Sequence, residues 1–242
     1  MRRYALAMRI AFAVLRLVAA AAIVAAVVGQ FVKSLSLVPE PGVFLVNFFS
    51  FFTIQSNLIG AVVLVVGAVL AFRGRDDSPG FALVRACATT YLTTTLVVFN
   101  LLLRDLALDQ AATVPWSNEI LHVWAPLYVL VDWVLAPGRR PIGWNRLWLV
   151  AVYPLVWAAY TMVRGPIADW YPYPFLNPDV APGVGYGGVL VYVLAIAAFI
   201  LLMGAGVLAL SRTSWPYPAD PALSGAAGSP RASAPRPRES VR

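Results

Sequence analysis

Residues 44–72 read FLVNFFSFFTIQSNLIGAVVLVVGAVLAF, without a single charged side chain. A helix that crosses the hydrocarbon core of a bilayer needs about 20 predominantly apolar residues. This stretch is long enough to span a membrane as one helix, and its polar side chains are confined to its first half. It predicts a transmembrane helix and sets the fold class of the chain.

Five further stretches share this character. They run over residues 4–29, 84–103, 120–136, 144–163 and 186–210. Of the 242 residues, 60% are hydrophobic and 12% charged, whereas a soluble domain carries about 25% charged residues. Such a chain has too little polar surface to cover itself in water. The sequence therefore predicts an all-α polytopic integral membrane protein, with six transmembrane helices in a domain over residues 1–212.

The basic residues predict an orientation, because Lys and Arg are enriched in short cytoplasmic connections. Each connection on one side of the predicted bundle carries a single basic residue, namely Lys33, Arg104 or Arg164. The opposite side carries most of the others, and both termini belong to it. We therefore expect both termini to be cytoplasmic and the protein to lie in the plasma membrane. The basic residues on this second side are Arg2, Arg3, Arg9, Arg73, Arg75, Arg85, Arg139, Arg140, Arg146 and Arg212.

The last 30 residues and the charge balance exclude several other classes. Residues 213–242 are rich in Pro, Ala, Ser, Gly and Arg, so we expect a disordered cytoplasmic tail that buries no core. The net charge of +7 is distributed as topology signals and anionic-lipid contacts, which argues against nucleic acid as a partner. The single Cys87 and single His122 exclude an intramolecular disulfide and a multi-imidazole metal site. We expect neither a metal nor a cofactor.

Polar side chains within apolar helices are costly, so they normally face the bundle interior and mark function. In the inner half, helical spacing predicts a structural ion pair between Arg16 and Asp132. In the outer half, four predicted spans bring polar groups to a similar depth, which favours a site there. These outer groups are Thr53, Asn57, Asn100, Arg104, His122, Tyr160 and Arg164.

Each outer residue also has a purely structural interpretation. A Thr in a membrane helix usually bonds the carbonyl four residues earlier, and a lone His near a helix end is more often an interfacial residue. Arg side chains can simply reach the headgroups. The aromatic residues that alternate with prolines in residues 165–185 fit either an interfacial loop or a lid over a cavity.

Two chemistries fit this set, and the first is nucleophilic catalysis on a lipid ester. Thr53 would supply the hydroxyl and His122 the general base, since a hydroxyl needs a base to become nucleophilic at neutral pH. Straight-helix counting places His122 about 6 Å nearer the surface than Thr53, so a tilt or a later start of the second span must close the gap. The candidates for oxyanion or substrate binding are Asn57, Asn100, Arg104, Tyr160 and Arg164.

Two short motifs carry a family resemblance. Residues 51–57 (FFTIQSN) open the second span and residues 121–126 (LHVWAP) open the fourth. With the six-span layout, they resemble the androgen-induced-protein family of integral membrane hydrolases, and more closely a bacterial six-span branch of the same layout. The resemblance implies hydrolysis of fatty acid esters of hydroxy fatty acids, with Thr53 and His122 as the catalytic Thr and His.

The second interpretation is non-enzymatic: a lipid or small-molecule binding or transport protein, or a membrane scaffold. Arg104, Arg164 and Asn100 would then bind an anionic headgroup. The sequence predicts neither broken helices nor internal repeats, and this argues against an alternating-access transporter.

Overall fold

The computed structural model describes residues 2–38, 40–104, 113–180 and 185–213, and the regular secondary structure within these ranges is helical throughout. The predicted tail therefore lies outside the described residues beyond Thr213. The helices are α1 (Arg2–Leu35), α2 (Pro41–Ser50), α3 (Phe52–Phe72), α4 (Pro79–Val98), η1 (Phe99–Leu103), α5 (Pro115–Glu119), η2 (Ile120–Trp124), α6 (Ala125–Leu135), η3 (Trp144–Arg146), α7 (Leu149–Ala168), η4 (Pro174–Leu176) and α8 (Gly185–Ser211).

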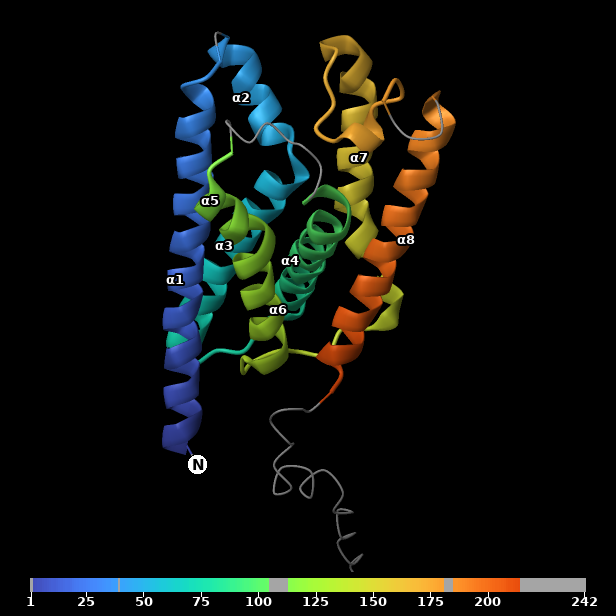
Figure 1. Ribbon diagram of the computed structural model, residues 1–242. Helices are drawn as coiled ribbons and strands as arrows, with labels where there is room; N and C mark the ends of the chain where they lie inside the picture. The colour runs from blue at the N-terminus through green and yellow to red at the C-terminus, as the bar shows by residue number, and fades with distance from the viewer. Residues whose placement is uncertain (1, 39, 105–112, 181–184, 214–242) are drawn as a thin grey trace, which may run out of the picture.

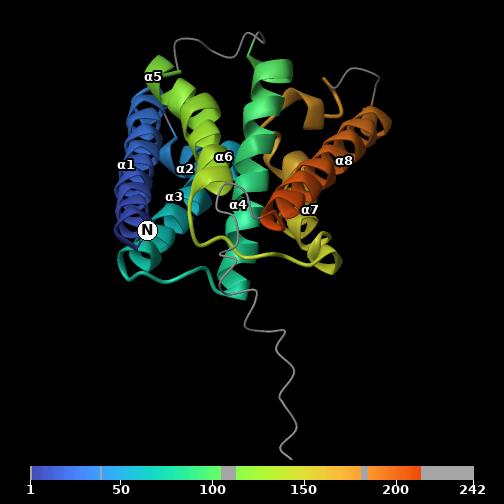
Figure 2. The ribbon, with the colours of Figure 1, turned by 90° about the horizontal axis from the view of Figure 1, so that it is seen from below.

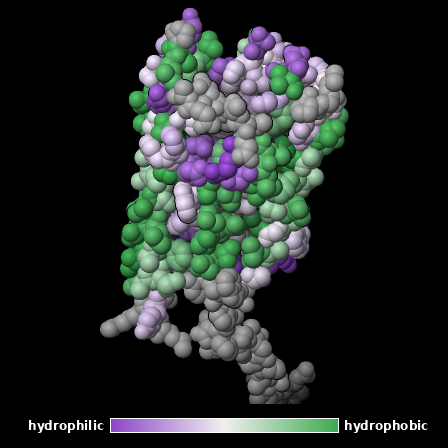
Figure 3. Space-filling model, viewed as in Figure 1, coloured by the Kyte–Doolittle hydropathy of each residue, from purple (hydrophilic) through white to green (hydrophobic). Residues whose placement is uncertain are grey.

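Five of these helical segments are long and apolar enough to cross a membrane. They lie side by side with α6 in one bundle (Figures 1 and 2), and hydrophobic residues cover most of the lower half of the face seen in Figure 3, below a hydrophilic patch. This confirms the all-helical membrane class. The predicted span at 120–136 corresponds to α5, η2 and α6, which follow one another directly but are each short. The five segments are Leu6–Leu35, Phe52–Phe72, Pro79–Leu103, Trp144–Ala168 and Gly185–Ser211.

The prediction of one continuous helix over residues 44–72 is wrong. The backbone becomes extended at Phe51, with φ −66° and ψ 127°, and this residue separates α2 from α3. The expectation that the chain has no broken helix fails at the same point. Near this break α2 descends from one end of the bundle toward the start of α3 (Figure 1).

Side chains provide the partners that the backbone loses at this break. The indole Nε1 of Trp157 donates to the Ser50 carbonyl at 2.9 Å, and Gln55 Nε2 donates to the Phe49 carbonyl at 2.6 Å. In apolar surroundings a break in a helix persists only where such partners satisfy the released groups. Sequence periodicity misses the break because Trp157 comes from a distant segment, in α7.

A buried ion network ties α1, α4 and α6 together at the end of the bundle opposite α2. The Asp132 carboxylate accepts from Arg16 Nε and from Arg85 Nη2, each at 2.8 Å, and Arg85 Nη1 also donates to Asp77 at 2.8 Å. Arg16 Nη1 donates to the Gly67 carbonyl at 2.9 Å. The predicted Arg16–Asp132 pair is confirmed. The placement of Arg85 in a connection is wrong, because two carboxylates compensate its charge inside the fold.

Candidate functional site

Thr53 lies in the first turn of α3, and its hydroxyl does not bond its own helix. Thr89, Thr90 and Thr94 each donate to the carbonyl four residues earlier, at 2.8–2.9 Å. The carbonyl four residues before Thr53 belongs to Phe49, on the far side of the break. The Thr53 hydroxyl instead lies 3.3 Å from the Tyr173 hydroxyl. The break thus directs this threonine away from the structural role that is usual in a membrane helix.

Tyr173 belongs to the segment that follows α7 and was not among the residues predicted for the site. Its hydroxyl also accepts from the Thr53 backbone N–H at 3.3 Å, and its ring stacks on Phe175 with a centroid distance of 5.3 Å. Burial raises the pKa of the Tyr173 phenol above its ordinary value, so the hydroxyl stays protonated at neutral pH. The alternating aromatic residues and prolines of residues 165–185 were the sequence signal for this segment. Of the two interpretations, an interfacial loop and a lid over a cavity, the lid fits better, because Tyr173 contacts Thr53.

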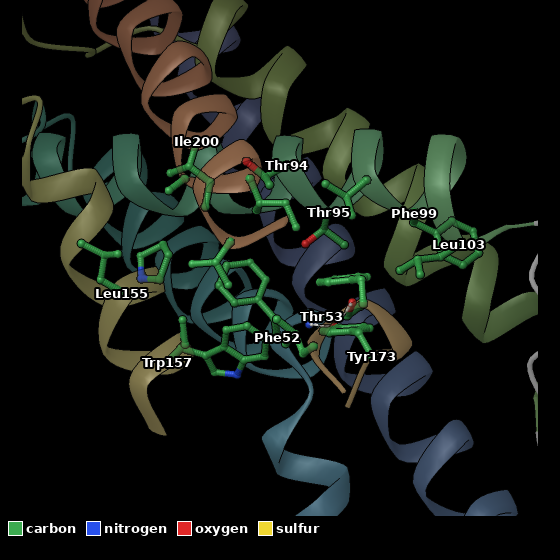
Figure 4. A pocket seen from close by; sticks show the side chains of 18 of the residues that line it. Phe52, Thr53, Thr94, Thr95, Phe99, Leu103, Leu155, Trp157, Tyr173 and Ile200 are labelled. Carbon is green, nitrogen blue, oxygen red and sulfur yellow. Dashed lines mark hydrogen bonds between the residues drawn. The ribbon is translucent and has the colours of Figure 1, made fainter. Parts of the chain in front are cut away.

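Two cavities meet at Thr53. The inner cavity is narrow, about 90 Å³, and lies among α4, α7, α8 and the segment after α7 (Figure 4). The outer cavity, about 530 Å³, is enclosed by α1, α2, η1, α5, η2 and the same segment. Thr53 and Tyr173 line both cavities together with Phe99 and Leu103. These four residues, which we call the septum, form the shared wall, and the Thr53 hydroxyl is part of it.

The two cavities differ in chemistry. Apart from Thr53 and Tyr173, the inner cavity has Thr94, Thr95 and the Trp157 indole as its polar contributors among mostly aliphatic side chains. Several polar side chains line the outer cavity. They are Gln30, Ser34, Glu40, Asn47, Thr113, Ser117, Asn118 and His122.

His122 lines the outer cavity, so the two predicted catalytic residues face a common space. Its Nδ1 lies 2.9 Å from the Asn118 carbonyl oxygen. Because a carbonyl oxygen can only accept, Nδ1 carries the proton and Nε2 holds the lone pair. The ring stacks on Phe99 with centroids 3.9 Å apart. The nitrogen that a general base requires is therefore the one left without a hydrogen bond in the described part of the chain.

No hydrogen bond joins Thr53 to His122 within the described residues: the Thr53 hydroxyl bonds Tyr173, and His122 Nδ1 bonds the Asn118 carbonyl. Helix α3 begins at Phe52, and the first part of the span predicted from the sequence forms the separate helix α2.

Asn57 lies behind Thr53, fully buried, and lines neither cavity. Its Nδ2 donates to the Thr53 carbonyl at 2.9 Å and to the Leu121 carbonyl at 3.0 Å. Both amide hydrogens are engaged, so this arrangement leaves no donor for an oxyanion.

Asn100 and Arg104 form a polar network at the outer end of η1. Asn100 accepts from Arg104 Nε at 2.8 Å, and Arg104 binds both carboxylate oxygens of Glu119, at 2.8 and 3.0 Å. Neither Asn100 nor Arg104 lines the two cavities. The network joins η1 to α5 beside the outer cavity and does not line it.

Tyr160 and Arg164 do not line the two cavities, and both contact α2 from α7. The Tyr160 hydroxyl lies 2.9 Å from Ser50 Oγ, and Arg164 Nη2 donates to Asn47 Oδ1 at 2.5 Å. The Arg164 guanidinium also lies over the Trp170 ring, 5.4 Å from its centroid. Asn47 and Trp170 line the outer cavity, so Arg164 acts on that wall through its neighbours.

These features define the class: a helical membrane protein in which a threonine hydroxyl separates an apolar cavity from a more polar one that an imidazole also lines. No group of three or more His, Cys, Asp or Glu side chains suited to a metal occurs within the described residues. No protein-family model, curated protein or solved structure matches the chain.

The septum makes a prediction about access to residue 53. In a Cys87→Ala background, the thiol introduced by Thr53→Cys should react slowly with a small maleimide while Tyr173 covers it. Adding Tyr173→Ala should raise the labelling rate severalfold, because the ring that closes the wall is gone. Tyr173→Phe keeps the ring and should leave the rate within about twofold. Equal rates for the Ala and Phe variants would show that Tyr173 does not cover this position.

Proposed function

We propose that this chain is an intramembrane lipid-ester hydrolase in which Thr53 is the nucleophile and His122 the general base. The observation that carries the proposal is the Thr53 hydroxyl, which leaves its own helix and lies where the two cavities meet. His122 supports it, since its unprotonated nitrogen is Nε2 and its ring lines the outer cavity. The motif resemblance points to the same two residues.

The chemistry follows from these groups. His122 Nε2 takes the proton of the Thr53 hydroxyl, and Thr53 Oγ1 attacks the ester carbonyl carbon. The alcohol leaves with the proton from Nε2, and water then hydrolyses the acyl-threonine with the same base. Thr53 must exchange its hydrogen bond with Tyr173 for one with His122. The Tyr173 phenol, which stays protonated, can then donate to the developing oxyanion.

Removing either catalytic group should abolish turnover. Thr53→Ala and His122→Gln should each lower hydrolysis of lipid esters by roughly 10²–10⁴-fold or more, because the nucleophile or its base is lost. A fluorophosphonate probe should label the wild type and fail to label Thr53→Ala. Ser56→Ala, a change at a buried hydroxyl one turn away, should keep both activities. A wild type that neither turns over a broad ester panel nor reacts with the probe would disprove the hydrolase.

The cavities support one placement of the substrate. The first few methylenes of an acyl chain fit the apolar inner cavity, the ester carbonyl lies at the septum, and the alcohol portion occupies the wider outer cavity. A narrow apolar cavity accepts an unbranched chain more readily than a ring system. The proposed substrate class is therefore an ester of an unbranched fatty acid.

This placement predicts a change in chain-length preference. Ala197 on α8 lines the inner cavity, whereas the adjacent Ala198 does not line it and is exposed. Ala197→Leu should shift the optimum toward shorter acyl chains and lower the ratio of long-chain to short-chain kcat/KM by roughly tenfold, as added methylenes do in apolar pockets. Ala198→Leu adds the same volume outside the cavity and should leave the ratio unchanged. A shift in both variants, or in neither, would contradict the placement.

We further propose that the chain crosses the plasma membrane six times, with both termini cytoplasmic. The helical path from Pro115 to Leu135 would be the remaining span, since at about 1.5 Å per residue it covers about 30 Å. The distribution of Lys and Arg supports this orientation.

Cysteine labelling checks the orientation. Ser36 and Thr213 are exposed and follow the ends of α1 and α8, respectively. In a Cys87→Ala background, an impermeant maleimide added to intact cells should label Ser36→Cys, and should label Thr213→Cys only after permeabilisation. The reverse pattern would invert the topology.

A lipid-binding protein without turnover is the second candidate. One observation favours it: the Thr53 hydroxyl bonds Tyr173 and not His122. In that case Thr53→Ala would retain lipid binding and the wild type would release no fatty acid, an outcome that the ester panel above distinguishes.

A further inference from the structure

We infer that Asn57 is a positioning residue that holds the turn carrying His122 against the turn carrying Thr53, through a carbonyl that Pro126 leaves without a backbone partner. The role of Asn57 in catalysis rests on the proposed function. The contacts that support it do not depend on any reaction.

Pro126 explains why this carbonyl is free. At the end of η2 the Ala125 N–H donates to the Ile120 carbonyl, five residues earlier, in place of the Leu121 carbonyl that an α-helix would pair with it. The next residue that could serve Leu121 in this wider pattern is Pro126, which has no N–H. The Leu121 carbonyl is therefore left in the bundle interior without a backbone donor, directly next to His122.

Asn57 donates a hydrogen bond to this carbonyl. Its Nδ2 donates at 3.0 Å to Leu121 and at 2.9 Å to the Thr53 carbonyl. Both partners only accept, so the amide can present only its NH₂ group to them. Because one nitrogen bonds both oxygens, the two carbonyl oxygens lie within about 6 Å of each other. The turns of the proposed nucleophile and base are thus joined through a single side chain.

The remaining contacts of His122 orient its ring but do not connect it to Thr53. Asn118 fixes Nδ1 from the same helix, and Phe99 stacks on the ring from η1. Asn57 is the residue that connects to both turns. Its side chain is fully buried, and its Oδ1 has no partner in the described part of the chain. A buried amide that satisfies only its donor group indicates that those two donated bonds are its role.

Histidine NMR tests the inference without any substrate, because His122 is the single histidine of the chain. Full-length protein with ¹⁵N-labelled histidine in nanodiscs should show one imidazole with the proton on Nδ1. Asn57→Ala should shift or broaden the imidazole signals, since the turn is no longer held, while Asn118 keeps the proton on Nδ1. Ser56→Ala is the matched control, because its hydroxyl donates to the same Thr53 carbonyl at 3.2 Å but not to Leu121. A wild-type spectrum in Asn57→Ala would overturn the inference.

Steady-state kinetics test whether the position of His122, held by Asn57, affects catalysis. With a lipid ester, Asn57→Ala should lower kcat by roughly 10–100-fold and leave KM within about threefold, because the base is misplaced while the cavities are unchanged. Ser56→Ala should retain kcat. If the wild type hydrolyses no ester, the proposed function fails, and the NMR comparison still decides whether Asn57 holds His122.

Pro126→Ala separates positioning from folding. The variant supplies the missing N–H, so the helix can close on itself and the Leu121 carbonyl no longer needs Asn57. The double variant Asn57→Ala/Pro126→Ala should recover the thermal midpoint lost in Asn57→Ala, but neither the wild-type histidine signal nor kcat. Recovery of all three would make Asn57 merely structural. If Asn57→Ala does not fold, Pro126→Ala alone decides, since it should disturb the histidine signal and a wild-type signal would overturn the inference.

Discussion

Backbone N–H and C=O groups released from a helix in apolar surroundings must find partners within the protein, because no water replaces them. The candidate site lies between two places where side chains satisfy such backbone groups. At Phe51 the chain leaves the helix, and Trp157, Gln55 and Tyr173 supply partners for the released groups. At Pro126 a backbone donor is missing, and Asn57 replaces it. Each irregularity lies next to a polar side chain at the wall of a cavity, the Thr53 hydroxyl or the His122 imidazole.

Hydropathy was sufficient to predict the fold class, because the length and composition of an apolar stretch directly determine whether it can span a bilayer. Helical spacing also predicted the Arg16–Asp132 pair, since a buried charge requires an opposite charge at its depth. The break at Phe51 could not be predicted this way. Its partner Trp157 is 107 positions away from Ser50 in the chain, and no local pattern reports a contact at that separation. Arg85 was misplaced for a related reason, as Asp77 and Asp132 approach it only in the folded bundle.

Of the seven residues predicted for the site, two line the cavities and five do not. Thr53 and His122 line a common cavity, which the placement of two motifs on neighbouring spans had indicated. Tyr173 was not selected, because its segment fitted an interfacial loop as well as a lid, and the sequence does not tell which of its aromatic residues contacts Thr53. Asn57 was selected as a polar residue on the correct helical face, but its role depends on which acceptors its amide meets. A carbonyl that a distant proline leaves free is visible only in the structure.

The ion network at the other end of the bundle has an electrical consequence. Arg16 and Arg85 carry two positive charges, and Asp77 and Asp132 carry two negative ones. A membrane potential does work on net charge that moves across it, about 2.3 kcal/mol per elementary charge per 100 mV. A neutral cluster that moves as one body does no such work. The network itself therefore adds no voltage-dependent work when it moves with its helices, although it places two guanidinium groups inside the bundle.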